Sequence, residues 1–162
     1  MNKQELDREL GEPGARELLA GSMARLGYNG YDGFPRVIPV GFHWTGQNIV
    51  ISTAPTAPKA RALAARPQVA VTIDAGESPE AARALLIRGL AVLDTVDGVS
   101  AEYLASARNS MSGAELEEFE RNIEATYRQM VRIVIEPVWA RFFDFGAGRL
   151  PGFLADLVDD AE

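Results

Sequence analysis

The 162-residue sequence contains no cysteine and a single histidine, His43. The absence of cysteine excludes disulfide bonds, thiolate metal sites and a cysteine nucleophile. One histidine cannot form a multi-histidine metal site, and no partner that would make His43 a general acid or base is recognisable. The chain also lacks a GxGxxG fingerprint and a phosphate-binding P-loop. The sequence therefore predicts no metal centre and indicates no catalytic residue.

Long apolar segments are missing as well. No run approaches the ~18 apolar residues that a membrane span needs, and the charged N-terminal residues do not resemble a secretory signal. The net charge of -7 disfavours binding to nucleic acid or to an anionic membrane. We therefore expect a cytoplasmic protein, and a length of 162 residues fits a single domain.

Acidic residues are absent between Asp32 and Asp74, although acids outnumber bases in the whole chain. The basic residues in this segment are Arg36, Lys59, Arg61 and Arg66. A local excess of positive charge in an acidic protein suggests a small anionic ligand. A chance gap in acidic residues within buried strands would give the same pattern, so charge alone leaves both interpretations open.

The middle of the chain is rich in β-branched and aromatic residues and in turn signals. It predicts strands near residues 25–28, 36–44, 48–53, 69–73, 84–93 and 131–145, with 36–44 and 48–53 paired as a hairpin. Helices are predicted at residues 4–10, 15–26, 59–65, 99–109 and 116–130 and after Pro151. Because the strands come in hairpins, we expect a mainly β fold, a six-stranded antiparallel split β-barrel with flanking helices.

The single predicted domain spans residues 1–162. It carries an N-terminal helical segment at 1–22, a helical insertion at 98–130 and a C-terminal tail at 150–162. There is no internal repeat and no low-complexity segment.

The most informative residues lie where the strand at 48–53 leads into the next helix. Ser52 and Thr53 end the strand, and Pro58 and Lys59 begin the helix. Hydroxyl groups, a lysine and the free N–H groups of a helix N-terminus form a plausible phosphate site, and the helix dipole favours an anion. The alternative is an ordinary strand–helix turn with a solvated lysine.

Several short motifs follow one another in a definite order along the chain. They are Asp32-Gly33, Arg36-Val37-Ile38-Pro39-Val40, Ile51-Ser52-Thr53, Lys59-Ala60-Arg61, Arg66-Pro67-Gln68-Val69-Ala70 and Arg88-Gly89. In this order and spacing, residues 20–145 resemble the pyridoxamine 5'-phosphate oxidase-like, FMN-binding split-barrel superfamily.

The resemblance implies a homodimer with the cofactor at the subunit interface. It implies that the cofactor ring lies beside the strand from Arg36 to Val40. It also implies that Ser52, Thr53 and Lys59, at the junction between the next strand and its helix, hold the cofactor phosphate. The implied cofactor-binding residues are Arg36, Val37, Ile38, Pro39, Val40, Ser52, Thr53, Pro58, Lys59, Arg61, Arg88 and Trp139. For Arg88 the alternatives are a contact with a dimer partner or an outward position on the barrel, and for Trp139 the alternative is packing within the barrel.

The loop before Lys59 departs from the pattern of the oxidases that act on pyridoxamine phosphate. Those proteins tend to carry Asn, Ser and a first cation where this chain has Ala54, Ala57 and Pro58. The departure argues against the vitamin B6 reaction itself.

Together these features predict an oxidoreductase that uses a flavin-type nucleotide for hydride transfer to or from a small organic substrate. FMN is favoured over coenzyme F420, because the acidic tail of F420 would need more positive charge. The alternatives are a non-catalytic flavin carrier, sensor or interaction protein, and a haem-binding protein with His43 as the axial ligand. A structural role for His43 beside Trp44 is the simpler interpretation.

Overall fold

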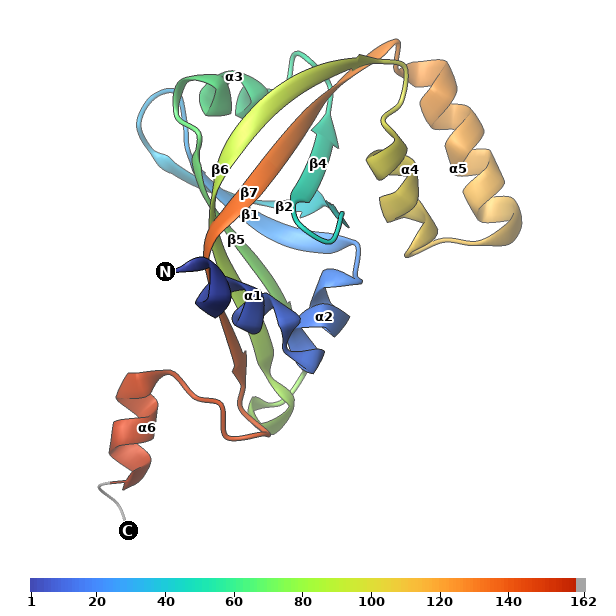
Figure 1. Ribbon diagram of the computed structural model, residues 1–162. Coiled ribbons are helices and arrows are strands. Elements are labelled where there is room, and N and C mark those ends of the chain that lie inside the picture. The colour runs from blue at the N-terminus through green and yellow to red at the C-terminus, as the bar shows by residue number, and fades with distance from the viewer. Residues whose placement is uncertain (160–162) are drawn as a thin grey trace.

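The computed structural model describes residues 1–159, which form one antiparallel sheet with helices around it (Figure 1). The strands are β1 (Met23–Asn29), β2 (Pro35–Gly41), β3 (His43–Trp44), β4 (Ile49–Thr53), β5 (Gln68–Ala75), β6 (Arg83–Asp97) and β7 (Gln129–Asp144). Their order in the sheet is β2-β1-β5-β6-β7-β4-β3. The sheet curls so that β2 approaches β4 without pairing with it. This arrangement confirms the predicted mainly β split barrel with flanking helices.

The hairpin predicted from residues 36–44 and 48–53 is wrong in its pairing. β2 pairs along its whole length with β1, with Val37 opposite Gly27, and only the two-residue strand β3 pairs with β4. Phe42 separates β2 from β3, because its side chain is buried and its N–H donates to the Ser22 carbonyl at 3.0 Å. The chain therefore crosses at Phe42 from one edge of the sheet to the other, and the sheet has seven strands where six were predicted.

The two longest strands, β6 and β7, form a continuous ribbon with one irregularity. The register shifts where Gly89 faces Pro137, so Val138 bulges out of the ladder. Pro137 has no N–H to donate, and a Cβ on Gly89 would lie 2.7 Å from the Glu136 carbonyl oxygen. Because a bulge strengthens the local twist, this point bends the ribbon around the barrel.

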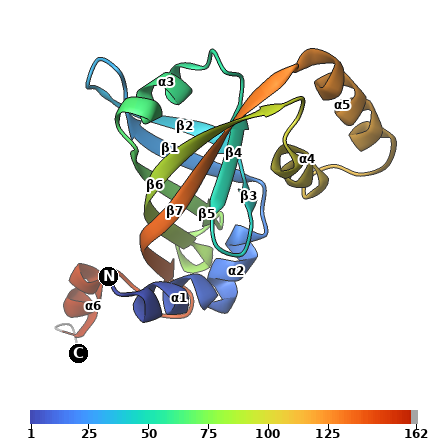
Figure 2. The same ribbon diagram turned by 45° about the horizontal axis from the view of Figure 1, so that its top comes forward.

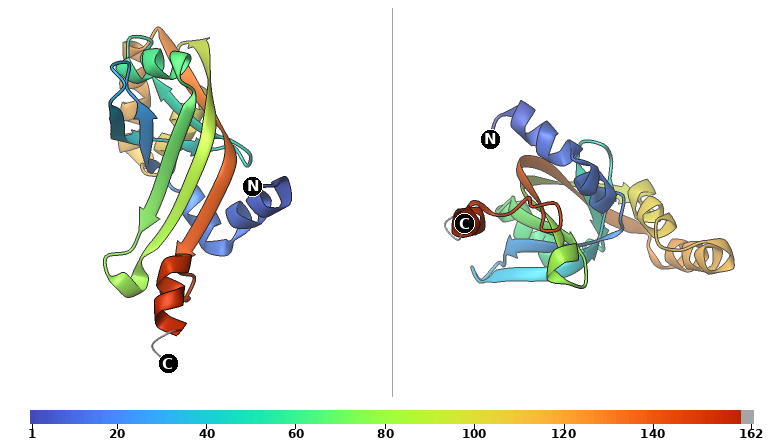
Figure 3. Two further views of the ribbon diagram at one scale, coloured as in Figure 1. Left: turned by 90° about the vertical axis from the view of Figure 1, so that its left-hand side faces the viewer. Right: turned by 90° about the horizontal axis from the view of Figure 1, so that it is seen from below.

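The helices occupy three sides of the barrel (Figures 2 and 3). They are α1 (Lys3–Gly11), α2 (Pro13–Leu19), α3 (Pro58–Ala65), α4 (Ala101–Arg108), α5 (Gly113–Thr126) and α6 (Gly152–Asp159). The α1–α2 pair packs near one end of the β6–β7 ribbon, α3 crosses the opposite end, and α4 and α5 form a side arm. None of these helices is long and apolar enough to cross a membrane. The predicted C-terminal tail contains α6, and its last three residues lie outside the described residues.

Alternating strand residues fill the barrel and leave a second, outward face. On β6, Leu85 and Ile87 are buried, whereas Arg88 and Leu90 are exposed. Burial of each large apolar side chain stabilises the fold by roughly 1.5–3 kcal/mol. The largest fully buried side chains are Phe42, Leu19, Leu26, Ile49, Ile51, Leu63, Leu85, Ile87, Met130, Ile133, Ile135 and Val71.

Candidate functional site

The basic segment predicted from the sequence becomes a cluster at one end of the barrel, where α3 lies beside the β1–β2 turn (Figure 2). The guanidinium of Arg61 lies over the ring of Tyr31, with its carbon 4.2 Å from the ring centroid. Arg66 follows α3 and donates a 2.6 Å hydrogen bond to the Gly30 carbonyl. Both arginines are therefore engaged with the same turn.

Arg36 reaches this turn from β2. It donates a 2.7 Å hydrogen bond to Asp32, and this bond lowers the pKa of the Asp32 carboxyl group. A Cβ on Gly30 would lie 3.1 Å from the guanidinium carbon of Arg36. Because Arg66 binds the Gly30 carbonyl, the two guanidinium groups meet at one glycine. We define Arg36, Lys59, Arg61 and Arg66 as the basic cluster.

Lys59 differs from the three arginines of the basic cluster, because it has neither an ion pair nor a hydrogen bond nor a cation–π contact among the side chains described for residues 1–156. Its side chain is half-buried, and burial lowers the pKa of its ammonium group. Pro58 occupies the first turn of α3, and the N-cap Ala57 offers no side chain to the free N–H groups. A half-buried lysine beside an uncapped helix N-terminus is suited to receive an anion.

The two hydroxyls predicted at this junction have different surroundings. The Ser52 and Ser100 Oγ atoms lie 2.6 Å apart, and Ser100 is the N-cap residue of α4. Thr53 is half-buried at the end of β4, opposite Val131. Ser52 thus connects the barrel to the side arm, while Thr53 remains at the start of the loop that leads to Lys59.

A groove of about 540 Å³ crosses the outward face of the sheet. Its centre follows one row of facing residues: Val37 pairs with Gly27, Gly27 with Ala70, and Ala70 with Arg88. Trp139 pairs with Arg88 on the next strand but does not line the groove. Small side chains on β1 and β5 therefore form the floor, and larger ones stand on either side. We call this surface the outer groove; it has the shape needed by a flat ligand.

The strand predicted to lie beside the cofactor divides between the two faces of the sheet. Val37 and Pro39 are exposed, and Val37 lines the outer groove. Val40 is buried and Ile38 packs against the core. Arg36 lines the groove and also belongs to the basic cluster. Arg36 is thus the residue at which these two features join.

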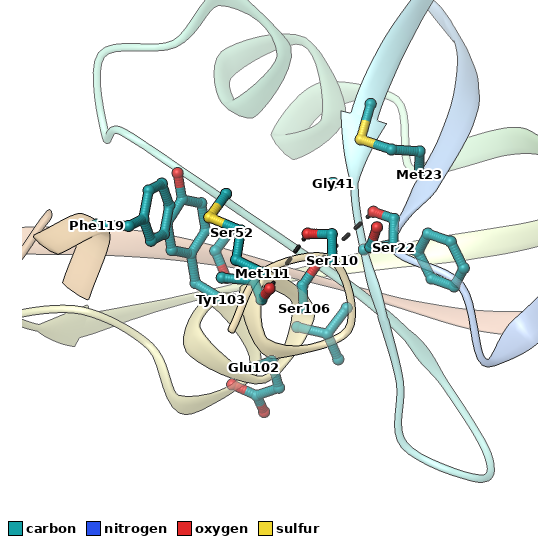
Figure 4. Close-up of a pocket in the computed structure, with 13 residues that line it drawn as sticks. Ser22, Met23, Gly41, Ser52, Glu102, Tyr103, Ser106, Ser110, Met111 and Phe119 are labelled. Atoms are coloured by element: carbon teal, nitrogen blue, oxygen red, sulfur yellow. Dashed lines mark hydrogen bonds between the residues drawn. The ribbon is translucent and has the colours of Figure 1, made fainter. Parts of the chain in front are cut away.

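A second pocket of about 250 Å³ lies between the barrel and the side arm (Figure 4). Ser52 is the one predicted site residue in its lining, which otherwise includes Tyr103, Met111 and Phe119. Sequence reasoning missed this pocket, because no motif marks it. A faint signal exists in the four-residue spacing of Tyr103 and Ala107, which places them on one face of α4.

His43 lies on β3 and lines neither the outer groove nor the second pocket. Its Nδ1 atom is buried and has no hydrogen-bond partner within the described part of the chain. Among the side chains described for residues 1–156, no three histidine, aspartate or glutamate residues converge as metal ligands would. The geometry therefore offers little support for a role of His43 in a bound group at the groove.

The structure combines an open antiparallel split barrel with a groove that lies beside a basic cluster. These features agree with the class of split-barrel proteins that the sequence motifs indicated. A family model described as pyridoxamine 5'-phosphate oxidase matches residues 15–142. The chain belongs to this family. A search of curated proteins found no match.

Solved structures share the fold over most of the chain. An F420 reductase is 25% identical, with a TM-score of 0.58 over 77% of this chain and 94% of that chain. A conserved hypothetical protein from Mycobacterium tuberculosis is 18% identical, with a TM-score of 0.62 over 93% and 89% of the two chains. A haem storage protein from Vibrio cholerae is 17% identical, with a TM-score of 0.56 over 80% and 92%. Proteins of this fold therefore serve more than one cofactor.

Proposed function

We propose that this protein is an oxidoreductase that binds a flavin-type nucleotide with its ring in the outer groove and its phosphate at the basic cluster. The observation that carries the proposal is the position of Arg36, which belongs to both features. A flat ring needs a floor of small residues, and Gly27 and Ala70 supply one. A phosphate needs a cation without a competing carboxylate, and Lys59 is such a cation.

The chemistry would be hydride transfer, which the bound cofactor supplies. The chain's residues would bind and orient the two reactants. Arg88 lines the groove at the proposed ring position, and its guanidinium carbon lies 4.5 Å from the indole centroid of Trp139. Because the cofactor would supply the chemistry and the protein the binding and orientation, no acid–base set is needed, which agrees with the absence of a recognisable one in the sequence.

FMN is the favoured cofactor. Arg61 and Arg66 are already engaged with Tyr31 and the Gly30 carbonyl, so few free cations remain for an acidic tail. F420 is the second candidate, and the similarity to an F420 reductase favours it. Neither the groove lining nor the basic cluster contains a histidine, cysteine or methionine, which makes haem a weaker candidate than FMN or F420.

A second copy of the chain would close the outer groove. The exposed fractions of Val37, Leu90, Val92 and Val138 are 70%, 42%, 64% and 45%. Apolar side chains gathered on one sheet face are typical of an interface. We therefore propose that the protein is a homodimer with the cofactor between its subunits.

The direct test is to titrate the purified full-length protein separately with FMN and with F420, following absorbance and cofactor fluorescence. We expect saturable binding of FMN and weaker binding of F420. Binding of neither would overturn the proposal. Binding without turnover of any reducible substrate would identify a carrier or sensor. A Soret band that disappears in His43→Ala would replace the flavin proposal by haem binding.

A further inference from the structure

The pocket between the barrel and the side arm, which we call the arm pocket, is separate from the outer groove and shares no lining residue with it. One wall is formed by the turn before β1, the end of β2 and strand β4, and the other by α4, α5 and their connection (Figure 4).

The arm pocket has the size and walls for a flat organic molecule. Its volume is about 250 Å³, whereas a cavity of about 150 Å³ holds benzene, so two fused rings fit. Tyr103 and Phe119 stand side by side with their ring planes 17° apart and their centroids 6.1 Å apart. Met23 and Met111 add flexible, polarisable side chains that adapt to aromatic ligands.

The charge on the arm pocket is balanced. Its ionised residue is Glu102, which accepts hydrogen bonds from Arg132, and these lower the pKa of the Glu102 carboxyl group. The pocket lining contains no lysine, arginine or histidine. An anionic ligand would therefore meet a carboxylate and no free cation, which disfavours it. The basic cluster, suited to anions, lies elsewhere on the barrel.

Polar groups in the arm pocket can still orient an uncharged ligand. The Tyr103 hydroxyl has no hydrogen-bond partner among the side chains described for residues 1–156, and burial raises the pKa of this phenol, which keeps it a donor. Ser106 and Ser110 donate to the carbonyls of Ser22 and Ala107, at 3.5 and 3.2 Å. Their hydroxyl oxygens keep lone pairs that can accept from a ligand.

We propose that the arm pocket binds an uncharged, flat organic molecule of about two fused rings. The inference goes beyond the proposed function, because the arm pocket shares no lining residue with the outer groove in which the cofactor ring is proposed to lie. It can therefore be tested on the protein without any cofactor.

The test uses two probes of equal shape, 2-naphthamide and 2-naphthoate, titrated into the full-length protein by calorimetry and ligand-observed NMR. We expect the neutral amide to bind at least tenfold more tightly than the carboxylate. Equal or tighter binding of the carboxylate would overturn the ligand class. Absence of amide binding up to its solubility would overturn the site.

Variants locate the binding. Ser110 is exposed at the rim of the arm pocket, so Ser110→Phe should block the pocket without disturbing the core and weaken amide binding at least tenfold. Ala114 is also exposed but lies outside the lining, so Ala114→Phe is the matched control and should leave binding unchanged. Unaltered amide binding in a folded Ser110→Phe protein would overturn the location.

A gain of function gives an independent check. Ser110→Lys places a cation at the rim and should reverse the preference, so that 2-naphthoate binds more tightly than 2-naphthamide. An unchanged preference would contradict the charge argument. FMN titrations of the same variants are read separately, because the residues proposed to hold FMN do not include Ser110. Absence of FMN binding by the wild type, with 2-naphthamide binding retained, would refute the proposed function and leave the arm-pocket proposal intact.

Discussion

The guanidinium of Arg88 lies over the indole ring of Trp139, 4.5 Å from its centroid, across the β6–β7 ladder. Both residues were predicted from the sequence to contact the cofactor, and the structure brings them into contact with each other. Trp139 is half-buried, whereas Arg88 is exposed. Trp139 therefore acts as the support that orients Arg88 at the edge of the outer groove.

This contact predicts non-additive effects on FMN binding. Arg88→Met and Trp139→Leu should each raise the FMN dissociation constant about threefold to tenfold, because a cation–π contact of this kind contributes about 0.5–1 kcal/mol or more. The double variant should be little weaker than the stronger single variant, since both remove the same oriented guanidinium. Trp44→Phe, at the other tryptophan, should leave the constant unchanged. Fully additive losses in a fluorescence titration would contradict the supporting role.

The second prediction concerns the two lysines of the chain. Lys59→Ala should weaken FMN binding at least tenfold, about 1.4 kcal/mol, because it removes a charge-assisted contact to the phosphate. Lys3→Ala is the matched control, since Lys3 is exposed on α1 and paired with Asp7 at 3.5 Å. Riboflavin, which has no phosphate, should bind both variants and the wild type alike. Unchanged FMN affinity in Lys59→Ala would refute the phosphate assignment.

Much of the barrel followed from local sequence signals, but the partner of β2 did not. Strand propensity at residues 36–44 identified a strand, whereas its pairing depended on Phe42, whose burial and bond to Ser22 redirect the chain. Sequence proximity favoured β4 as the partner of β2. The actual partner is β1, where the helical composition of residues 15–26 concealed part of the strand.

The candidate site was predictable to a similar degree. The basic cluster could be expected, because four cations without acidic neighbours occupy one segment of the chain. The arm pocket could not, because it depends on contacts between distant residues. Arg132 on β7 forms an ion pair with Glu102 on α4, and the hydroxyl groups of Ser100 and Ser52 form a hydrogen bond. No local pattern encodes such pairings.

The third prediction tests self-association through the outward face of the sheet. The wild type should have the mass of a dimer in light scattering at micromolar concentration. Val92→Glu should raise the dimer dissociation constant more than about a hundredfold, because a buried unpaired charge costs several kcal/mol. Ala114→Glu adds the same charge on α5 and should remain dimeric. A monomeric wild type, or a dimeric Val92→Glu variant, would show that this face is not the interface.

The last prediction concerns Glu9, a buried carboxylate that attaches α1 to β7. Its side chain is 4% exposed and accepts hydrogen bonds from the Phe142 N–H at 2.9 Å, from Arg141 at 3.0 Å and from Arg149 at 2.6 Å. Burial opposes ionisation, but these bonds outweigh it and lower the pKa of the Glu9 carboxyl group. Removal of the charge in Glu9→Gln should decrease the free energy of unfolding by about 2–3 kcal/mol at neutral pH.

The lowered pKa fixes the sign of the pH dependence. Because the folded-state pKa lies below the ordinary value of 4.5, the stabilisation by Glu9 is fully present above that value and is lost as the pH falls through the folded-state pKa. Urea unfolding curves should therefore converge for the wild type and Glu9→Gln as the solution is acidified. Glu17→Gln removes an exposed carboxylate paired with Arg83 at 2.6 Å, and surface pairs contribute about 0–1 kcal/mol. If Glu17→Gln destabilised the protein as strongly as Glu9→Gln, burial would not explain the effect, and the attachment of α1 would have to depend on charge at the surface.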